Sequence, residues 1–449
     1  YLKQDNAEVE RQLVDQAEPA DAFATLVGRS HPASASLPPA WRQLLKTHPH
    51  DDICGCSVDP VHQDNEYHMR QASDAALAVQ RQSIYRVLGA LGTVAADDER
   101  YAVALASRQP VAHSGRVRLQ WDFEGRVLFG DDEPPAAYAL VDEDGSEVPF
   151  REVWRGRSTE HPHHAITLEL EPHLEPFSLQ RFYMEPRDSM PLTEQAPDTL
   201  ENEHLHVREH PDGSFTLTDR ATGQAYERLG LFSDQADVGD TYDFRALEDE
   251  QESLLDSARF VTDRGNGCSG LQVVEMNGEL AVPETSDDES RSDVMARLPV
   301  RLELSLAPGA RRLDCRLSFE NTARNHRLRW NLALPWTPSV SRSGLKFNTV
   351  DRAVREVEET DEDSVAPVHP ADHFVSVANQ NGGLALFSEF PVNYEVVPGS
   401  DPRLAVTLLR SVAMLSRTGA GPKTPTPEAQ CLRAFDIRFG IMRFQPSEE

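Results

Sequence analysis

Lysine is nearly absent from this chain of 449 residues. Of its 44 basic residues, the lysines are Lys3, Lys46, Lys346 and Lys423, and arginine supplies the rest. Acidic residues number 74, so the formal net charge is -30 at pH 7. Nucleic-acid binding depends on clustered basic residues that neutralise phosphates. A surface of this sign repels phosphate backbones, and nucleic acid is therefore not expected as a partner.

Long apolar runs are also missing. Runs such as "AYAL" and "LALF" are far shorter than the roughly 18–20 residues that span a bilayer. Residues 1–30 contain no basic segment followed by an apolar core, the pattern of an export signal. The five cysteines, Cys54, Cys56, Cys268, Cys315 and Cys431, are few and odd in number, which disfavours a disulfide framework. These absences favour a reducing, cytoplasmic location without membrane contact.

Several common catalytic motifs are lacking as well. The sequence has no phosphate-binding glycine-rich loop, no G-x-S-x-G elbow and no short-period repeat. Kinase, dinucleotide-binding and serine-hydrolase functions therefore lose their main sequence support.

Residues 1–96 show the spacing of amphipathic helices. In "YLKQDNAEVERQLVDQAEPADAFATLV" the apolar residues that recur near a helical period are Leu2, Val9, Leu13 and Phe23. "LPPAWRQLLK" suits a short helix that begins with proline. "PVHQDNEYHMRQASDAALAVQRQSIYRVLGALG" predicts a long helix that ends near Gly89 and Gly92. We expect an antiparallel three-helix bundle.

From about residue 97 the period changes to that of β-strands. "HLHVREHPDGSFTLTDR" predicts a hairpin that turns at Asp212-Gly213. "LPVRLELSLAPGARRLDCRLSFEN" predicts another, which turns at Pro308-Gly309. The apolar face of this second hairpin comprises Val300, Leu302, Leu304, Leu306, Leu313, Cys315, Leu317 and Phe319. We expect a small β domain over residues 97–190 and a large antiparallel β-sandwich over residues 200–449.

The stretch "HPHDDICGCSVD", residues 48–59, concentrates possible metal ligands, and three interpretations of it stay open. It could be a helix-linking turn in which Asp51 or Asp52 caps a helix. It could be a closed structural zinc site, although C-x-C is tighter than the usual spacing and no second ligand pair follows. It could also be one part of an open catalytic metal site that other residues complete.

The longer stretch "HPHDDICGCSVDPVHQDNEYHMRQA" closely resembles a motif of bacterial glycoside hydrolase family 38, the zinc-dependent α-mannosidases. "GDTYDF", "NTARNHRLRW", "LLRSVAMLSR" and "TPTPEAQC" are similar to successive signatures of that family's C-terminal β region. The resemblance covers nearly the whole chain in the right order. It implies a multidomain α+β protein in which the helix bundle precedes all-β domains, the larger of them a galactose-mutarotase-like sandwich.

The resemblance also implies roles for individual residues. The histidine that binds the catalytic zinc corresponds to His50, and the aspartate that contacts sugar hydroxyls corresponds to Asp51. A tyrosine that reaches the glycone pocket corresponds to Tyr242. Arg329 and Arg410 lie in resembling stretches, and their roles stay open.

For the other residues of the motif, His48 is expected to support the site, and Cys54 and Cys56 are expected to be packed thiols in a tight turn. Asp52 stands where serine is common in the family.

Family 38 enzymes are retaining glycosidases, and their nucleophile and acid/base residues lie in an N-terminal barrel. The resemblance implies that this barrel should precede Tyr1, so no catalytic carboxylate is expected in this chain. The intact protein is expected to hydrolyse α-mannosidic linkages with zinc, on a mannoside or a mannose-containing oligosaccharide. This chain alone is expected to be inactive. Two alternatives stay open: a non-catalytic carbohydrate-binding or assembly module, and one subunit of a split enzyme, either of which could form a homo-oligomer.

The acidic surface predicts a dependence on salt. The Debye length falls from about 10 Å at 0.1 M salt to about 3 Å at 1 M, so molar salt screens the self-repulsion of a chain with net charge -30. We expect the free energy of unfolding, measured with urea, to rise between low and molar NaCl. Unchanged stability across that range would contradict this expectation and the hypothesis of a salt-tolerant source.

Overall fold

The computed structural model of the chain describes residues 1–27, 35–90, 101–107, 110–114, 116–122, 135–157, 164–189, 199–247, 253–254, 261–264, 272–354, 367–380, 382–417 and 419–445. The predicted boundary between residues 96 and 97 lies outside these residues, as do Cys268 and most of the interval from 190 to 200. The described part is mostly β, with helices confined to its N-terminal region apart from a short 3₁₀ turn, Pro427–Gln430. No described helix has the length and apolar character needed to cross a membrane.

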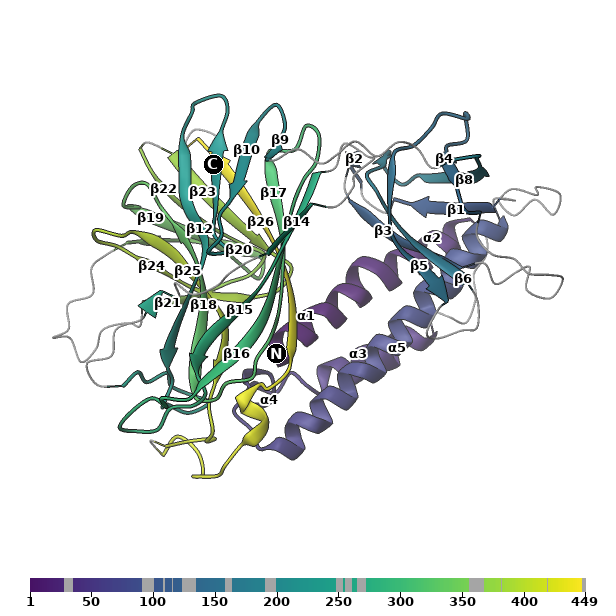
Figure 1. Cartoon of the computed structure of the whole chain (residues 1–449). Helices are drawn as coiled ribbons and strands as arrows, with labels where there is room; N and C mark the ends of the chain where they lie inside the picture. Colours follow the sequence, from purple (N-terminus) through teal and green to yellow (C-terminus); the bar gives the residue numbers. More distant parts are fainter. Residues whose placement is uncertain are drawn as a thin grey trace.

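The N-terminal region contains one long helix, α5 (Asp59–Ala90), and several shorter ones (Figure 1). The shorter elements are α1 (Leu2–Arg11), a π-helical stretch (Gln12–Ala17), α2 (Glu18–Leu26), α3 (Leu37–Leu45) and the one-turn α4 (His50–Cys54). All of them contact α5. The three segments predicted to be helical are therefore helical, whereas their description as a three-helix bundle stays a prediction.

The π-helical stretch changes which residues face the helical core. Leu2, Val9 and Leu13 are buried as predicted, but Phe23 is only partly buried and Ala24 takes the core position. A π turn inserts one extra residue into the helical repeat, so every later residue is rotated by one position. Phe23, which recurs near the helical period in the sequence, therefore lies beside the buried face rather than in it.

The residues after 100 form antiparallel sheets throughout the described strand pairs. Three small sheets come first, with strand orders β1-β8-β4, β3-β6-β5 and β2-β7. Their strands are β1 (Tyr101–Ala106), β2 (His113–Ser114), β3 (Val117–Asp122), β4 (Tyr138–Val141), β5 (Phe150–Arg157), β6 (His164–Leu170), β7 (His173–Leu174) and β8 (Leu179–Pro186). The sheets β1-β8-β4 and β3-β6-β5 share one apolar core, in which Tyr138 stacks on Phe150 at a centroid distance of 5.0 Å.

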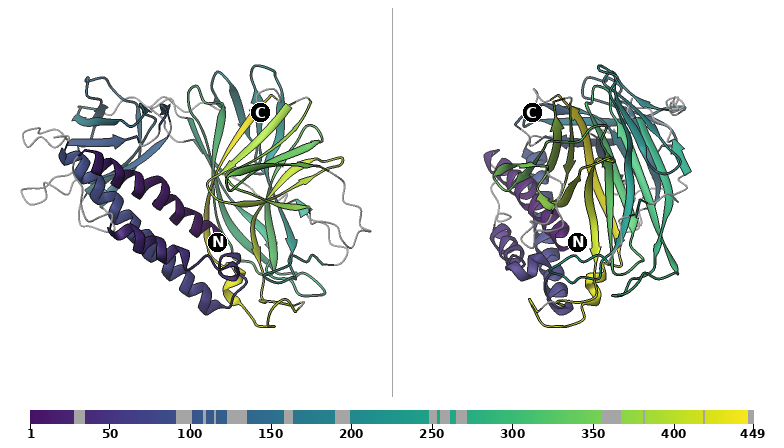
Figure 2. Two further views of the ribbon diagram at one scale, coloured as in Figure 1. Left: turned by 180° about the vertical axis from the view of Figure 1, so that it is seen from behind. Right: turned by 90° about the vertical axis from the view of Figure 1, so that its left-hand side faces the viewer.

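Two nine-stranded sheets follow and pack face to face (Figure 2). Sheet I has the order β21-β24-β25-β18-β12-β11-β10-β9, with β13 beside β12. Its strands are β9 (Leu200–Glu201), β10 (Leu205–Glu209), β11 (Phe215–Asp219), β12 (Ala225–Ala236), β13 (Ser253–Leu254), β18 (His326–Ala333), β21 (Val368–Ala371), β24 (Val392–Val397) and β25 (Arg403–Ser411).

Sheet II has the order β14-β15-β16-β17-β26-β23-β22-β19-β20. Its strands are β14 (Val261–Arg264), β15 (Gln272–Pro283), β16 (Met295–Leu306), β17 (Arg312–Glu320), β19 (Val340–Leu345), β20 (Asn348–Ala353), β22 (Phe374–Asn379), β23 (Gly382–Ser388) and β26 (Ala434–Phe444). In Figures 1 and 2 the helices and the small sheets lie on the same side of this sandwich.

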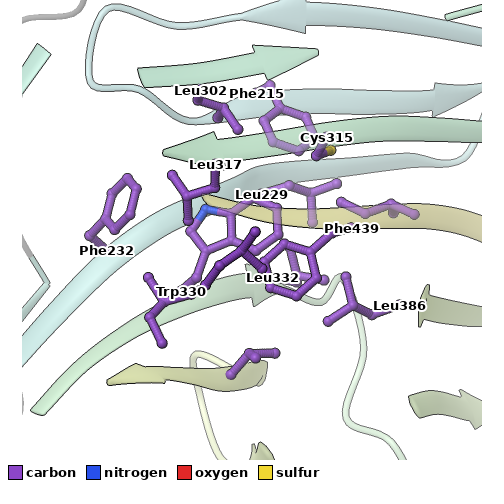
Figure 3. Close-up of a cluster of buried hydrophobic side chains, with 14 of the residues drawn as sticks. Phe215, Leu229, Phe232, Leu302, Cys315, Leu317, Trp330, Leu332, Leu386 and Phe439 are labelled. Atoms are coloured by element: carbon purple, nitrogen blue, oxygen red, sulfur yellow. The ribbon is translucent and has the colours of Figure 1, made fainter. Parts of the chain in front are cut away.

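The core of the sandwich lies between the two large sheets (Figure 3). Trp330 of sheet I stacks on Phe439 of sheet II with ring centroids 5.1 Å apart, and Phe215 approaches it at 6.5 Å. Both predicted hairpins are confirmed, since β10 pairs with β11 and β16 with β17. All eight apolar residues predicted for the second hairpin are buried in this core.

The small sheets meet the sandwich through buried charges rather than through this core. Arg116, just before β3, donates hydrogen bonds of 2.5 Å to Glu169 on β6 and to Glu303 on β16. The two carboxylate side chains are only 1% and 4% exposed. Burial raises the pKa of Glu303, but the charge of Arg116 and its hydrogen bond outweigh burial and hold that pKa below its ordinary value.

This contact predicts a loss of stability in acid. A folded-state pKa below the ordinary value of 4.5 means that Glu303 contributes its full stabilisation above about pH 4.5 and loses it as the pH falls through the folded-state pKa. Glu303→Gln should lower the free energy of unfolding by about 1.5–3 kcal/mol at neutral pH, because Arg116 loses a charged partner. Urea unfolding of both proteins at pH 7 and pH 3 measures this change.

The matched control is Glu275→Gln. Glu275 lies opposite Glu303 in the β15–β16 pair, but its side chain is more exposed, at 23%. We expect a smaller effect there because an exposed ion pair contributes little. Equal stability of Glu303→Gln and the unmodified chain at pH 7 would refute the prediction.

Candidate functional site

The motif of residues 48–59 folds around the single helical turn α4. Pro49 precedes the turn, and Gly55 ends it in the left-handed conformation with φ of 76°. The N–H of Gly55 donates to the carbonyl of Asp52, and that of Cys56 donates to the carbonyl of Asp51. A left-handed glycine that closes a helix in this way is a common C-terminal cap. The local sequence therefore fixes a tight turn with His50 and Asp51 at its start.

His50, the predicted zinc ligand, and Asp51, the predicted sugar-binding residue, both face solvent. The side chain of His50 is 92% exposed and that of Asp51 is 59% exposed. The His50 Nε2 atom lies 3.4 Å from Asp51 Oδ1. His48 instead turns to helix α1, where its Nε2 atom lies 2.8 Å from Asn6 Oδ1.

The cysteines of the turn differ from each other. Cys54 is exposed, so the prediction that it is a packed thiol was wrong. Cys56 is partly buried and contacts another part of the chain. The Cys56 thiol is 3.8 Å from the Thr241 carbonyl oxygen, to which it donates.

Thr241 belongs to the loop that follows β12 and carries Tyr242. Asp240, which is 1% exposed, organises this loop with both carboxylate oxygens. Its Oδ1 atom accepts from the N–H groups of Tyr242 and Asp243, both at 2.9 Å. Its Oδ2 atom accepts from the N–H of Arg417 at 2.5 Å. These bonds fix the backbone of Tyr242.

Asp237 and Arg410 hold the base of the same loop. Asp237 is completely buried, and its Oδ2 atom accepts from Arg410 Nε at 2.6 Å. Arg410 also donates to the carbonyl oxygen of Asp240 at 3.0 Å. A side chain at Gly239 would place its Cβ only 2.0 Å from the Asp243 carbonyl oxygen, so glycine is required there. Arg410, whose role the sequence left open, thus anchors the loop.

A second arginine holds the loop through an aromatic ring. The guanidinium of Arg327 lies over the ring of Phe244, 3.7 Å from its centroid. Arg329, by contrast, pairs with Glu395 within sheet I. Sequence reasoning missed the anchors of the loop because the residues that meet there are far apart in the chain, as with Arg410 and Asp237, which are 173 positions apart.

The α4 turn and the Tyr242 loop lie close together. Partial desolvation raises the pKa of the exposed Tyr242 side chain, and the negative charges of Asp51 and Asp240 raise it further. Tyr242 is therefore neutral at physiological pH and can donate a hydrogen bond, while the neighbouring Asp51 can accept one. The structure thus brings two of the three predicted site residues together from distant parts of the sequence, and His50 lies beside Asp51.

These residues do not by themselves form a zinc site. A zinc site normally needs four ligands, or three protein ligands and an open position. Within the described ranges no group of three or more His, Cys, Asp or Glu side chains is arranged to hold a metal ion. His50 offers one exposed imidazole, so any zinc bound here would need ligands from outside the described residues.

Comparison with known proteins gives consistent relatives. A "Putative mannosylglycerate hydrolase" of Halalkalibacterium halodurans is 25% identical over 501 aligned positions, which cover 98% of this chain and 53% of that protein. An alpha-mannosidase from Enterococcus faecalis has the same fold, with a TM-score of 0.82 and 24% identity over 100% of this chain and 55% of its own. A second E. faecalis structure, a glycosyl hydrolase family 38 protein, gives a TM-score of 0.83 and covers 57% of its own chain.

The chain thus spans about half the length of these relatives. Residues 200–416 match the family described as "Glycosyl hydrolases family 38 C-terminal domain". This match covers β12 and the Tyr242 loop that follows it, together with Arg410. Residues 200–416 therefore carry a C-terminal domain of glycosyl hydrolase family 38.

Proposed function

We propose that this chain is the middle and C-terminal portion of a retaining α-mannosidase that hydrolyses α-mannosidic linkages with zinc. Its parts would be a three-helix bundle over residues 1–96, a small β domain over 97–190 and the family 38 sandwich over 200–449. The observation that carries the proposal is the contact, through Cys56 and Thr241, between the turn that carries Asp51 and the loop that carries Tyr242. Asp51 lies on a helical turn and Tyr242 on a sandwich loop, and separate elements hold both in place.

In this proposal the chain contributes to binding rather than to the covalent step. The two carboxylates of a retaining pair, nucleophile and acid/base, would come from an N-terminal barrel. Asp51 would accept hydrogen bonds from sugar hydroxyls, and the neutral Tyr242 would donate to the sugar from the other side. His50 would be one ligand of the metal, which when bound supplies a Lewis acid for substrate oxygens.

The side chains that anchor the Tyr242 loop support a role of this chain in sugar binding. Binding a sugar costs less conformational entropy when the groups that contact it are already fixed. Asp240, Asp237 and Arg410 fix the backbone at Tyr242 before any ligand arrives. Tyr242 would therefore act as a preformed wall of the sugar pocket.

The partners of the chain follow from the same proposal. Two of the relatives are named as a mannosylglycerate hydrolase and an alpha-mannosidase. These names support an α-mannoside as the substrate class. The macromolecular partner would be the N-terminal barrel, in the same polypeptide or as a separate subunit. Free thiols at all four cysteines of the described ranges support a reducing, cytoplasmic location.

The purified chain should not hydrolyse an aryl α-mannoside and should bind zinc weakly, because one histidine cannot supply a complete metal site. Addition of the N-terminal half, fused or in trans, should produce turnover and tight zinc binding. Release of the aryl alcohol and metal titration measure the two effects. Turnover by the chain alone would contradict the proposal. Inactivity of the assembled protein would favour a non-catalytic binding module.

Within the assembled protein, Asp51→Asn should lower kcat/KM about 10- to 100-fold, because a charged acceptor for hydroxyl groups is lost. His50→Ala should lower zinc content as well as activity. The matched control is Asp52→Asn. Asp52 lies on the same turn, and its backbone N–H and carbonyl groups form hydrogen bonds within that turn. Equal losses in Asp51→Asn and Asp52→Asn would count against a specific contact of Asp51 with substrate.

A further inference from the structure

A cavity of the molecule is separate from the candidate site of His50, Asp51 and Tyr242. This cavity, of about 610 Å³, lies between the small sheets and the outward face of sheet II. None of His50, Asp51 or Tyr242 lines it. Its lining includes five arginines, Arg116, Arg118, Arg312, Arg316 and Arg438, and four carboxylates, Glu169, Glu303, Asp314 and Glu389, in a chain whose net charge is -30.

The register of sheet II leaves one of these arginines poorly neutralised. Arg316 on β17 and Arg438 on β26 are direct cross-strand partners. Like charges opposite each other destabilise a sheet unless other groups compensate. Arg316 is compensated by two hydrogen bonds from its guanidinium to Asp436. Arg438 Nη1 lies 3.5 Å from the carboxylate of Glu389, and the charge of Arg438 also acts on Asp436, which Arg316 already binds.

On the opposite wall of the cavity, formed by the small sheets, another arginine also shares a carboxylate with other arginines. Glu169 lies between Arg118 and Arg151 in the register of β3, β6 and β5. Its carboxylate is already bound by Arg116 at 2.5 Å and by Arg151 at 2.8 Å. Arg118 is a third cation, at 4.0 Å, and has no closer acidic partner among the described residues. Its side chain is 47% exposed, and that of Arg438 is 58% exposed.

In the floor of the cavity a glycine leaves room for the Arg312 side chain. Gly440 on β26 lies opposite Asp314, and Arg312 extends across it. A Cβ at position 440 would come within 2.6 Å of the Arg312 side chain and would displace it. The remaining lining includes the hydroxyl groups of Ser305 and Ser388 and the ring of Phe387. These groups suit the body of a small molecule, and pockets of this volume are typical of small-molecule sites.

We propose that this cavity binds a small organic anion whose phosphate or carboxylate group is held between Arg118 of the small sheets and Arg438 of the sandwich. Guanidinium groups keep their charge at every physiological pH and match the geometry of oxyanions. The acidic surface as a whole repels anions at long range. Charges beyond a Debye length of about 10 Å are screened, so the arginines nearest to a bound anion have the larger effect on its binding. Such an anion would join the two parts of the chain on which these arginines lie.

The test is a binding titration of the 449-residue chain at constant ionic strength. D-mannose 6-phosphate and D-mannuronate serve as the phosphate and carboxylate probes, and D-mannose is their neutral counterpart. We expect saturable binding of at least one anion and none of D-mannose at the same concentration. The double variant Arg118→Met with Arg438→Met should weaken binding about tenfold or more, because two charged donors are lost.

Two control variants show whether anion binding depends on this cavity. Arg342→Met removes an arginine of sheet II that binds Asp351 outside the cavity lining, and it should leave anion binding unchanged. Asp51→Asn should also leave it unchanged, so failure here and failure of the mannosidase proposal are distinguishable. Binding that does not saturate, equal binding of D-mannose, or full binding by the double variant would each overturn the proposal. Should the double variant fail to fold, the comparison of charged and neutral probes on the unmodified chain still decides.

Discussion

The apolar layer between the two nine-stranded sheets is the constraint on which the rest of the structure depends. Each sheet buries one face in that layer, and the alternation of β-strands then sends every second side chain outward. The outward face of sheet II is free to carry charge. There it meets the helices through Lys346 with Glu10 and the small sheets through Arg116 with Glu303. The core thus holds the sandwich together, and ion pairs position the other parts against it.

The same apolar layer explains why the candidate site lies at the edge of the sandwich, on a loop that follows a buried strand. Strand β12 is buried as far as Ala236, and the chain turns immediately afterwards at Asp237. The turn inherits the rigidity of the strand because Asp237 and Asp240 satisfy its N–H groups and Arg410 anchors both. The α4 turn then needs only to lie beside it, through Cys56 and Thr241. A rigid scaffold with contact groups on its bordering loops is a common way to build a binding site.

Local rules predicted the parts of the fold that depend on neighbouring residues. Alternating apolar residues around Asp212-Gly213 and Pro308-Gly309 specified both hairpins, since turn chemistry and register act over a few positions. The contacts that join distant segments had no such signal. Arg116 and Glu303 are 187 positions apart, and the π turn that displaced Phe23 leaves no mark in the apolar spacing. His50, Asp51 and Tyr242 came from a family resemblance, because spacing alone left the metal, turn and structural interpretations open.

The preference for arginine also determines how the joints of this molecule respond to alkali. A lysine loses its charge near pH 10.4, whereas a guanidinium keeps its proton above pH 12. Among the residues that the structure describes, the ion pairs that tie the helices and small sheets to the sandwich use arginine apart from Lys346, as in Arg116, Arg11 and Arg433. Their carboxylate partners are fully ionised at high pH. The assembly of the chain's parts should therefore persist in strongly alkaline media, and its electrostatic limit lies on the acid side, where the carboxylates take up protons.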